Sequence, residues 1–210
     1  MMNMNEFDLM FAVVGVDIPS DHGYLLYSAV KKCIGIENIQ GIGIHPVKGR
    51  RAGNRCYLPD RPRLIIRCGA CNIHNILKLT GQSLRIGDSS ITVGVPSIIS
   101  LRPSPCLYSP LVVFKNSKAE KENRRYDPKI DSSPDFFQQH ITKELAELGI
   151  KGKPSILEQP RVLSIKGNKI VGHPVKVSSL LPEDSLHLQS VGLGGRRAMG
   201  AGLFCPITEK

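Results

Sequence analysis

His45 stands in a setting that could perform acid–base chemistry on a phosphate ester. It lies in the segment GIGIHP, and the cations Lys48, Arg50 and Arg51 follow shortly after it. An imidazole has an ordinary pKa of about 6.5, so it can accept or donate a proton near neutral pH. The cations could bind a substrate phosphate. We therefore give His45 slightly more weight than His22 as the proton donor or acceptor, although the sequence alone does not decide which of the two is the principal catalyst; the alternative is a loop histidine without a partner.

His22 and Tyr27 are further candidate catalytic residues. His22 stands at the expected start of a helix, where free N–H groups favour phosphate, and Tyr27 follows within the same helix. We predict that both orient the substrate or share proton transfer with His45. The alternative for His22 is a capping or packing role. The other histidines are expected to be structural or exposed: His74, His140, His173 and His187.

A glycine-rich segment, GLGGRRAMGAG, is the second motif that could bind an anion. Glycine lets the backbone approach a ligand closely, so the N–H groups of Gly194, Gly195 and Gly200 could turn toward phosphate oxygens. Arg196 and Arg197 would add positive charge. The segment is neither a GK[ST] nucleotide loop nor a dinucleotide-binding fingerprint, so nucleotide hydrolysis is not indicated. The alternative is a tight chain reversal that only requires glycine.

The overall charge favours a polyanionic partner. Lys and Arg total 28 against 18 Asp and Glu, which gives a net charge of +10 and a pI of about 9.5. This balance favours nucleic acid, although scattered surface lysines would give the same sum. Lys166 and Lys169 are predicted contacts because they flank a turn in an expected hairpin. Aromatic residues make up only 5% of the chain, so we expect backbone charge and shape to dominate recognition.

The first half of the chain predicts alternating strands and helices. Residues 9–16 are typical of a buried strand, and a helix follows from Asp21 to just before Gly35. A second helix is expected over residues 72–79. Strands are expected over residues 83–86, 90–95 and 98–102, with the turn GDSS between the first two.

Three prolines between residues 102 and 110 predict a boundary between two halves, because proline ends helices and central strands. The second half predicts the order strand, helix, strand, strand, helix, strand, which is that of a ferredoxin-like unit. Its expected elements are helices over 134–148 and 182–191, a hairpin turning at Gly167-Asn168, a last strand over 203–206, and a polar loop over 118–133. We predict an α+β protein of two tandem ferredoxin-like (RRM-like) domains, residues 1–105 and 106–210.

Membrane and metal-dependent classes of protein are disfavoured. The apolar run over residues 9–16 is too short to span a bilayer and follows acidic residues, so we expect a cytoplasmic protein without membrane contact. Only Cys68 and Cys71 form a CxxC pair, and no second ligand pair stands at zinc spacing. We expect no metal and no cofactor. A basic scaffold whose CxxC pair binds a metal is the unrelated alternative.

Several segments together resemble a known family. The glycine pattern, placed after a helix and before a last strand, resembles the glycine-rich loop of the repeat-associated mysterious proteins (RAMP superfamily) of CRISPR systems. Within that superfamily the sequence resembles the CRISPR repeat-processing endoribonucleases of the short myxococcal type (I-MYXAN). The segments that carry this resemblance are PSDHGYLLYSAV, GIGIHPVKG, LSIKGNKIVGHPVKVSSLLPEDSLHLQ and VGLGGRRAMGAGLF.

The resemblance implies cleavage of precursor CRISPR RNA within its repeat stem-loops. The reaction would need no metal, because the 2′-hydroxyl of the RNA is the nucleophile, and the product would stay in a type I effector complex. In the family the catalytic histidine lies in or shortly after the first helix, which both His22 and His45 match. The alternative is a catalytically inactive repeat-RNA-binding subunit of a CRISPR effector or CRISPR-associated transposon complex.

Overall fold

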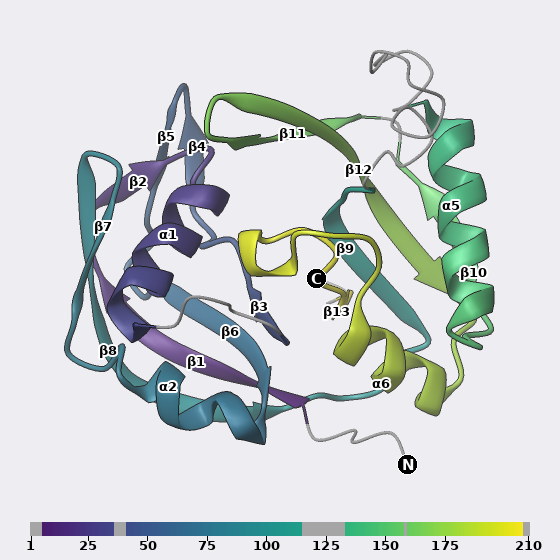
Figure 1. The fold of residues 1–210 in the computed structure, drawn as a ribbon, viewed down its shortest axis with the longest axis horizontal. Helices are drawn as coiled ribbons and strands as arrows, with labels where there is room; N and C mark the ends of the chain where they lie inside the picture. The colour runs from purple at the N-terminus through teal and green to yellow at the C-terminus, as the bar shows by residue number, and fades with distance from the viewer. Residues whose placement is uncertain (1–5, 36–40, 115–132, 158, 208–210) are drawn as a thin grey trace. The chain divides into compact units, whose positions relative to one another are not determined.

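The computed structural model describes residues 6–35, 41–114, 133–157 and 159–207 of the 210-residue chain. The chain forms two compact units that each combine helices with antiparallel strands (Figure 1), so the predicted α+β class is confirmed. The first unit comprises Met1–Leu101 and Arg197–Gly200, and the second comprises Arg102–Arg196 and Ala201–Lys210. No helix in the described ranges is both long and apolar enough to cross a membrane.

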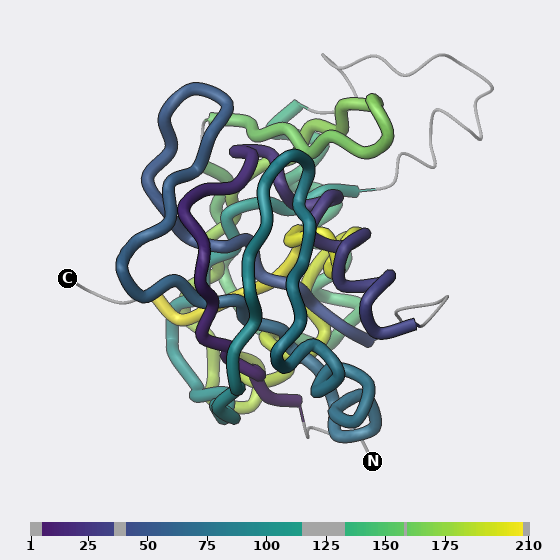
Figure 2. The backbone as a smooth tube through the Cα atoms, turned by 90° about the vertical axis from the view of Figure 1, so that its left-hand side faces the viewer, coloured from purple at the N-terminus to yellow at the C-terminus, as the bar shows by residue number. Residues whose placement is uncertain are grey.

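The first unit is built on a five-stranded antiparallel sheet with the order β3-β6-β1-β8-β7. Helices α1 (Gly23–Ile34) and α2 (Ile73–Leu77) contribute to the core on one face. The hairpin of β7 and β8 runs beside β1 (Figure 2). The strands are β1 (Glu6–Val14), β3 (Ile42–Ile44), β6 (Arg63–Gly69), β7 (Ser83–Ile86) and β8 (Ser89–Ser100).

Alternation of side chains gives this sheet an apolar face and a polar face. Leu9 of β1 and Ile66 of β6 are buried in one core cluster with Leu26 of α1. Successive side chains of a strand point to opposite faces. Asp8 and Arg67, each next in sequence to one of these core residues, therefore lie on the face away from the helices. This polar face carries the candidate site.

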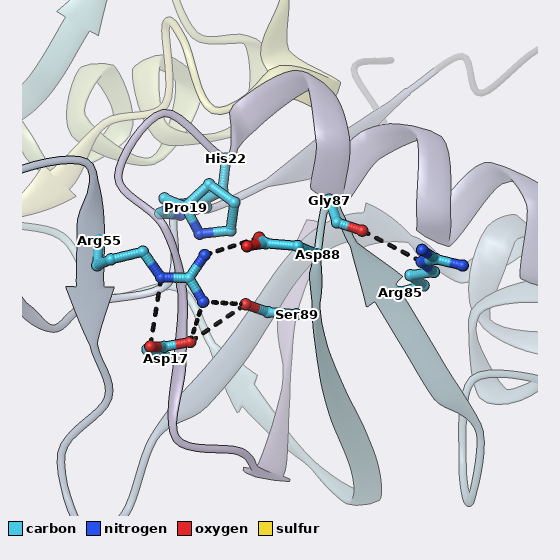
Figure 3. A network of polar contacts seen from close by, with 8 residues as sticks. All are labelled: Asp17, Pro19, His22, Arg55, Arg85, Gly87, Asp88 and Ser89. Atoms are coloured by element: carbon cyan, nitrogen blue, oxygen red, sulfur yellow. Dashed lines mark hydrogen bonds and ion pairs between the residues drawn. The ribbon is translucent and has the colours of Figure 1, made fainter.

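A small sheet with the order β2-β5-β4 is joined to the β7–β8 turn through Arg55 (Figure 3). Arg55 Nη1 donates to Asp88 at 2.7 Å and Nη2 donates to the Ser89 hydroxyl at 2.6 Å. Arg55 also donates to both carboxylate oxygens of Asp17, and these bonds lower the pKa of Asp17. The small sheet is thus fixed at several points. Its strands are β2 (Asp17–Pro19), β4 (Arg50–Ala52) and β5 (Arg55–Tyr57).

The second unit has the strand order β10-β12-β9-β13, with β11 also paired to β12. Helices α5 (Pro134–Glu147) and α6 (Pro182–Val191) supply Phe137 and Leu188 to its core. Ser133 caps α5 by accepting a hydrogen bond from the Phe136 N–H at 3.2 Å. The strands are β9 (Cys106–Val112), β10 (Lys153–Ile156), β11 (Arg161–Ile165), β12 (Asn168–Ser178) and β13 (Cys205–Pro206).

Most predicted elements form close to their expected bounds. Helix α6 has the predicted limits and α5 ends one residue early. The β11–β12 hairpin turns at Lys166-Gly167 rather than at Gly167-Asn168. Lys166 has φ 49° and Gly167 has φ 82°, which suits a two-residue turn with positive φ at both positions. The predicted second helix is shorter, a 3₁₀ turn (Ala70–Asn72) followed by α2, and the last strand is limited to β13. The predicted polar loop lies outside the described residues except for Ser133.

Two predicted strand ends are wrong, and both lie at a proline. Residues 89–100 form one strand, β8, although two are predicted, and β9 contains Pro110 although the proline-rich segment is predicted to end strands. Pro96 lies where the pairing of β8 with β1 shifts register, and Pro110 lies where that of β9 with β12 does. A β-bulge tolerates proline because the ladder there does not need its missing N–H.

Candidate active site

His45 lies directly after β3, on the polar face of the first unit's sheet. Its backbone N–H donates to the carbonyl oxygen of Ile65 at 2.9 Å, which extends the pairing of β3 with β6 by one residue. Its Nε2 lies 3.9 Å from Asp8 Oδ1, and its side chain is 12% exposed. The imidazole is therefore largely enclosed: its Nε2 is buried, and only another part of the side chain is open to solvent.

Asp8 and Arg67 form an ion pair beside this imidazole. They are directly opposite each other on β1 and β6, so their side chains meet on one face. Arg67 Nε donates to Asp8 Oδ1 at 2.8 Å, and Nη2 donates to Oδ2 at 3.0 Å. Arg67 is only 1% exposed, and this two-bond pairing offsets the cost of burying a guanidinium. On its other side Arg67 faces Gly43 of β3, which has no side chain to compete for the space.

Glu6 and Arg197 add a second ion pair to the first unit. Glu6 lies two residues before Asp8 on β1 and hence on the same face. Arg197 begins a 3₁₀ turn (Arg197–Met199) and donates from Nη2 to Glu6 Oε2 at 3.3 Å. Burial raises the pKa of Glu6 and lowers that of Arg197. Arg197, a predicted RNA contact, is thus engaged by a carboxylate.

The imidazole of His45 is uncharged at neutral pH. Burial is the main cause that lowers its pKa from 6.5 to about 3, and the positive charge of Arg67 acts in the same direction. The charge of Asp8 opposes this shift but is paired with Arg67. A neutral imidazole can accept a proton, whereas donation requires the charged form. The ring as it stands therefore suits a general base.

His22 links the start of α1 to the segment that follows His45. It is the N-cap residue of α1 and is 2% exposed. Its Nδ1 lies 2.9 Å from the carbonyl oxygen of Pro19, to which it can only donate, and its Nε2 accepts the N–H of Val47 at 3.0 Å. Burial lowers the pKa of His22, in agreement with the neutral tautomer that this pattern requires. Both ring nitrogens are thus engaged by protein groups.

Tyr27 lies half-buried on α1 and packs against the core of the first unit. Its ring centroid is 6.2 Å from that of Tyr24. His22 is the N-cap residue of the same helix, so the helix holds Tyr27 at a fixed distance from His22. The predicted cationic contacts, apart from Arg197, are exposed: Lys48, Arg50 and Arg51 after His45, Lys166 and Lys169 at the β11–β12 hairpin, and Arg196 in the glycine-rich segment.

The glycine-rich segment uses its N–H groups within the protein. The Gly194 N–H lies 3.0 Å from both carboxylate oxygens of Glu144, and the Gly195 N–H donates to the carbonyl of Val113 at 2.9 Å. The Gly200 N–H donates to the carbonyl of Arg197 at 3.1 Å. In this structure the three glycines therefore do not turn these groups toward a phosphate as predicted, because each already has a protein acceptor.

Gly194 shows what the glycines are needed for. Its φ is +69°, and an added Cβ would lie 2.3 Å from the carbonyl oxygen of Val113. A side chain at this position would collide with the backbone of Val113, the residue directly after β9. Only glycine therefore allows the glycine-rich segment to approach the end of β9 this closely. Glu144 of α5 secures the same point, and burial raises the pKa of its carboxyl. Close packing of the backbone therefore accounts for this glycine.

The CxxC pair is poorly suited to bind a metal. Cys68 is fully buried, Cys71 is exposed, and burial raises the pKa of Cys68 to about 12. A metal ligand must be a thiolate, which this environment disfavours. Within the described ranges, no group of three or more His, Cys, Asp or Glu side chains is arranged to hold a metal ion.

Sequence reasoning missed the roles of both Asp8 and Arg67. A signal was present: Glu6 and Asp8 alternate with apolar residues along β1, which places two carboxylates on one face of a strand. Which cation each one meets depends on strand register, and no local pattern in the sequence shows that.

Comparison with known proteins relates the chain to a family. The family model "Cas6 Crispr" matches residues 7–209. The "CRISPR-associated endonuclease Cas6" of Myxococcus xanthus (strain DK1622) is 30% identical over 200 residues, which cover 95% of this chain and 80% of the relative.

Solved structures share the fold at low sequence identity. A structure described as "An RAMP protein binding different RNA substrates" has a TM-score of 0.68 and 15% identity, covering 96% of this chain and 100% of its own. Another, "CRISPR associated protein Cas6", has a TM-score of 0.67 and 15% identity, covering 97% and 100%.

Proposed function

Because the chain belongs to the Cas6 family, we propose that it is an endoribonuclease that cuts precursor CRISPR RNA within repeat stem-loops. The observation that carries this proposal is His45, a neutral and partly exposed imidazole followed directly by the exposed cations Lys48, Arg50 and Arg51. A proton acceptor and groups that can bind a phosphate are thus present in one short segment.

We propose that each unit is a ferredoxin-like domain, with the boundary near residue 105. Numbering β1, β3, β6 and β8 from one to four gives the sheet order 2-3-1-4, beside which β7 is an addition. Strands β9, β10, β12 and β13 of the second unit give the same order, and β11 is the addition there. In each unit helices follow the first and third of these strands, as in a βαββαβ arrangement.

The proposed cleavage proceeds without a metal ion. The His45 imidazole takes the proton of the 2′-hydroxyl, the 2′-oxygen attacks the adjacent phosphorus, and the bond to the 5′-oxygen breaks. The departing oxygen takes a proton from the imidazolium or from water, which leaves a 2′,3′-cyclic phosphate and a 5′-hydroxyl. A bound phosphate would raise the His45 pKa from about 3 toward neutrality, where proton transfer is more effective.

His22 is assigned a positioning role in this proposal, in place of proton transfer. Its two hydrogen bonds support this role, because they hold Val47, two residues after His45 and one before Lys48. A proton relay would require a ring nitrogen that can exchange partners during the reaction. Tyr27 remains a proposed contact that orients the RNA.

The proposed RNA contacts are the exposed cations of both units. Arginine and lysine neutralise phosphates without reading sequence, which suits recognition of a stem-loop by charge and shape. The glycines Gly194, Gly195 and Gly200 act by shaping the segment that presents Arg196. The proposed contacts are Lys48, Arg50, Arg51, Lys166, Lys169, Arg196 and, after exchange of its ion pair, Arg197. We further propose that the protein works in the cytoplasm and that the product RNA stays bound in a type I effector complex.

A cleavage assay with purified protein in excess over repeat RNA, in the presence of EDTA, tests the proposed activity. We expect cleavage in EDTA and a loss of about 100- to 10,000-fold in the single-turnover rate of the His45→Ala variant, because general-base catalysis contributes this much. The matched control is His74→Ala, at an exposed histidine of α2, which should cut at the wild-type rate.

Two results would contradict the proposal. Cleavage that requires magnesium would contradict the metal-free mechanism. An unchanged rate in the His45→Ala variant would show that His45 is not the general base. Tight binding of repeat RNA without any cleavage would select the inactive RNA-binding subunit instead.

A further inference from the structure

Tyr57 lies on the outward face of the small sheet β2-β5-β4. In this sheet Ile18 and Cys56 are paired neighbours, and both are buried at 0% and 1% exposure. Tyr57 follows Cys56 on β5 and is paired with Asp17 on one side and Arg50 on the other. Because successive side chains of a strand alternate, Tyr57 points to the face opposite that of Ile18 and Cys56. Tyr57 is 40% exposed, which leaves part of this aromatic residue in contact with solvent.

Arg50 lies against this ring from the neighbouring edge strand. The two residues are directly opposite each other on β4 and β5, and the guanidinium carbon is 5.6 Å from the ring centroid. Arg50 forms no ion pair with any residue in the part of the chain that the structure describes. It is exposed, as are Lys48 and Arg51 on either side. An aromatic face bordered by uncompensated cations is the combination that binds single-stranded nucleic acid.

The support beneath Tyr57 is rigid. Arg55, two residues before Tyr57 and on the same face, is bonded to Asp17 and to the β7–β8 turn (Figure 3). On the other side, a Cβ added to Gly49 would lie 2.4 Å from the Tyr57 carbonyl oxygen, so the chain before β4 is pressed closely onto β5. A ring held in place before binding loses little conformational entropy when a ligand stacks on it.

We propose that Tyr57 and Arg50 form a stacking site for an unpaired nucleotide of the RNA substrate. An unpaired base would stack on the Tyr57 ring, and Arg50 would contact the adjoining phosphate. A base inside a stem has no free face, so the occupant is a single-stranded segment flanking the stem-loop. Stacking tolerates any base, so the site contributes affinity and positioning and does not read sequence. The inference rests on the proposed function, because it assigns a part of the same RNA to this site.

The affinity of Tyr57 variants for two RNAs tests the site. One RNA is the repeat stem-loop with single-stranded flanks on both sides, and the other is the same stem-loop trimmed to its paired stem. We expect Tyr57→Leu to bind the flanked RNA about 5- to 100-fold more weakly, the range known for loss of one base–aromatic stack, and to bind the trimmed RNA normally. Tyr57→Phe keeps the ring and should bind both RNAs normally. Arg50→Gln should weaken binding more than the matched control Arg85→Gln, which removes an exposed charge elsewhere in the first unit.

The outcomes separate this inference from the proposed activity. Unchanged affinity of folded Tyr57→Leu for flanked RNA, or equal loss with both RNAs, overturns the stacking site even if the protein cleaves. Tyr57-dependent binding of flanked RNA without cleavage keeps the site and removes the proposed nuclease. A wild-type protein that binds neither RNA overturns both. Circular dichroism of Tyr57→Leu and Tyr57→Phe shows whether each variant is folded.

Discussion

The segment from His45 to Arg51 and the segment from Gly192 to Gly202 both combine cations with at least one glycine, yet they use their polar groups differently. In the first, a buried side chain, His22, holds the backbone at Val47 and leaves three cations exposed. In the second, the backbone N–H groups are taken up by Glu144 and by carbonyl oxygens. A segment binds a ligand most readily with those groups that its own fold has left without a protein partner.

The largest effect should come from replacing Gly194, because the glycine-rich segment is held by close packing. Gly194→Ala puts a Cβ 2.3 Å from the Val113 carbonyl oxygen at a φ of +69°. Overpacking and left-handed strain each cost about 1–3 kcal/mol, so we expect the free energy of unfolding to fall by about 3 kcal/mol. Urea unfolding of the variant and of the wild type measures this difference in the free energy of unfolding.

Gly195→Ala is the matched control for this substitution. No atom lies within 4 Å of the added Cβ at Gly195, so its unfolding free energy should change by less than about 0.5 kcal/mol. If both variants are equally stable, the glycine-rich segment is loosely packed, and it then does not differ from the His45–Arg51 segment in the way described.

The next effect concerns the hydrogen bonds of His22. His22→Ala leaves the Val47 N–H and the Pro19 carbonyl oxygen without this side chain, and we expect a 10- to 100-fold lower kcat of RNA cleavage, as is typical for residues that orient a catalytic group. His22→Gln offers an amide oxygen to the Val47 N–H and should recover part of the rate. The pH at which kcat falls should be the same in both variants.

A different result would assign His22 a chemical role. If His22→Gln is as inactive as His22→Ala and the acid limb of the kcat profile moves, then His22 transfers protons. Hydrogen exchange at the Val47 amide, faster in His22→Ala than in the wild type, provides a readout that does not depend on cleavage.

Per pH unit, the smallest effect is a pH dependence of stability due to His45. Its pKa is about 3 in the folded protein and 6.5 when unperturbed, so the unfolded chain binds the proton more readily. The free energy of unfolding should therefore be highest above pH 6.5 and fall as the pH drops toward 3, by at most about 1.4 kcal/mol per unit from this group. Urea midpoints measured at pH 7, 6 and 5 should show this trend.

His45→Asn supplies the comparison, since asparagine does not titrate. Its stability should depend less steeply on pH between 7 and 5 than that of the wild type. The carboxyls of Glu6 and Glu144 have raised pKa values and act in the opposite direction, with stability lost as the pH rises above 4.5, but they are common to both proteins. Parallel curves would show that His45 is not buried as described.

The sequence predicts features that depend on local signals. Helix α6 begins at Pro182, with Glu183 and Asp184 in its first turn, and these residues suffice to locate it. The β11–β12 hairpin follows from a turn-favouring pair, although the turn is displaced by one residue. The elements of both units therefore follow largely from short patterns.

Contacts between distant segments could not be predicted in the same way. His22 and His45 both suit catalysis in the sequence, and only the folded structure shows that the first has both ring nitrogens engaged while the second lies beside Asp8. The pairing of Asp8 with Arg67 depends on the register of β1 against β6. Likewise, the glycines suggest a ligand until the partners of their N–H groups are known.

The Glu6–Arg197 pair joins the first residue of β1 to a turn 191 positions downstream. During translation β1 can meet β6 and β8 early, but this guanidinium is synthesised only after residues 102–196 of the second unit. A truncated product that stops at residue 101 would carry a half-enclosed carboxylate with no cation to compensate it. Completion of the amino-terminal unit therefore has to wait until residues 197–200 have been synthesised, after most of the second unit.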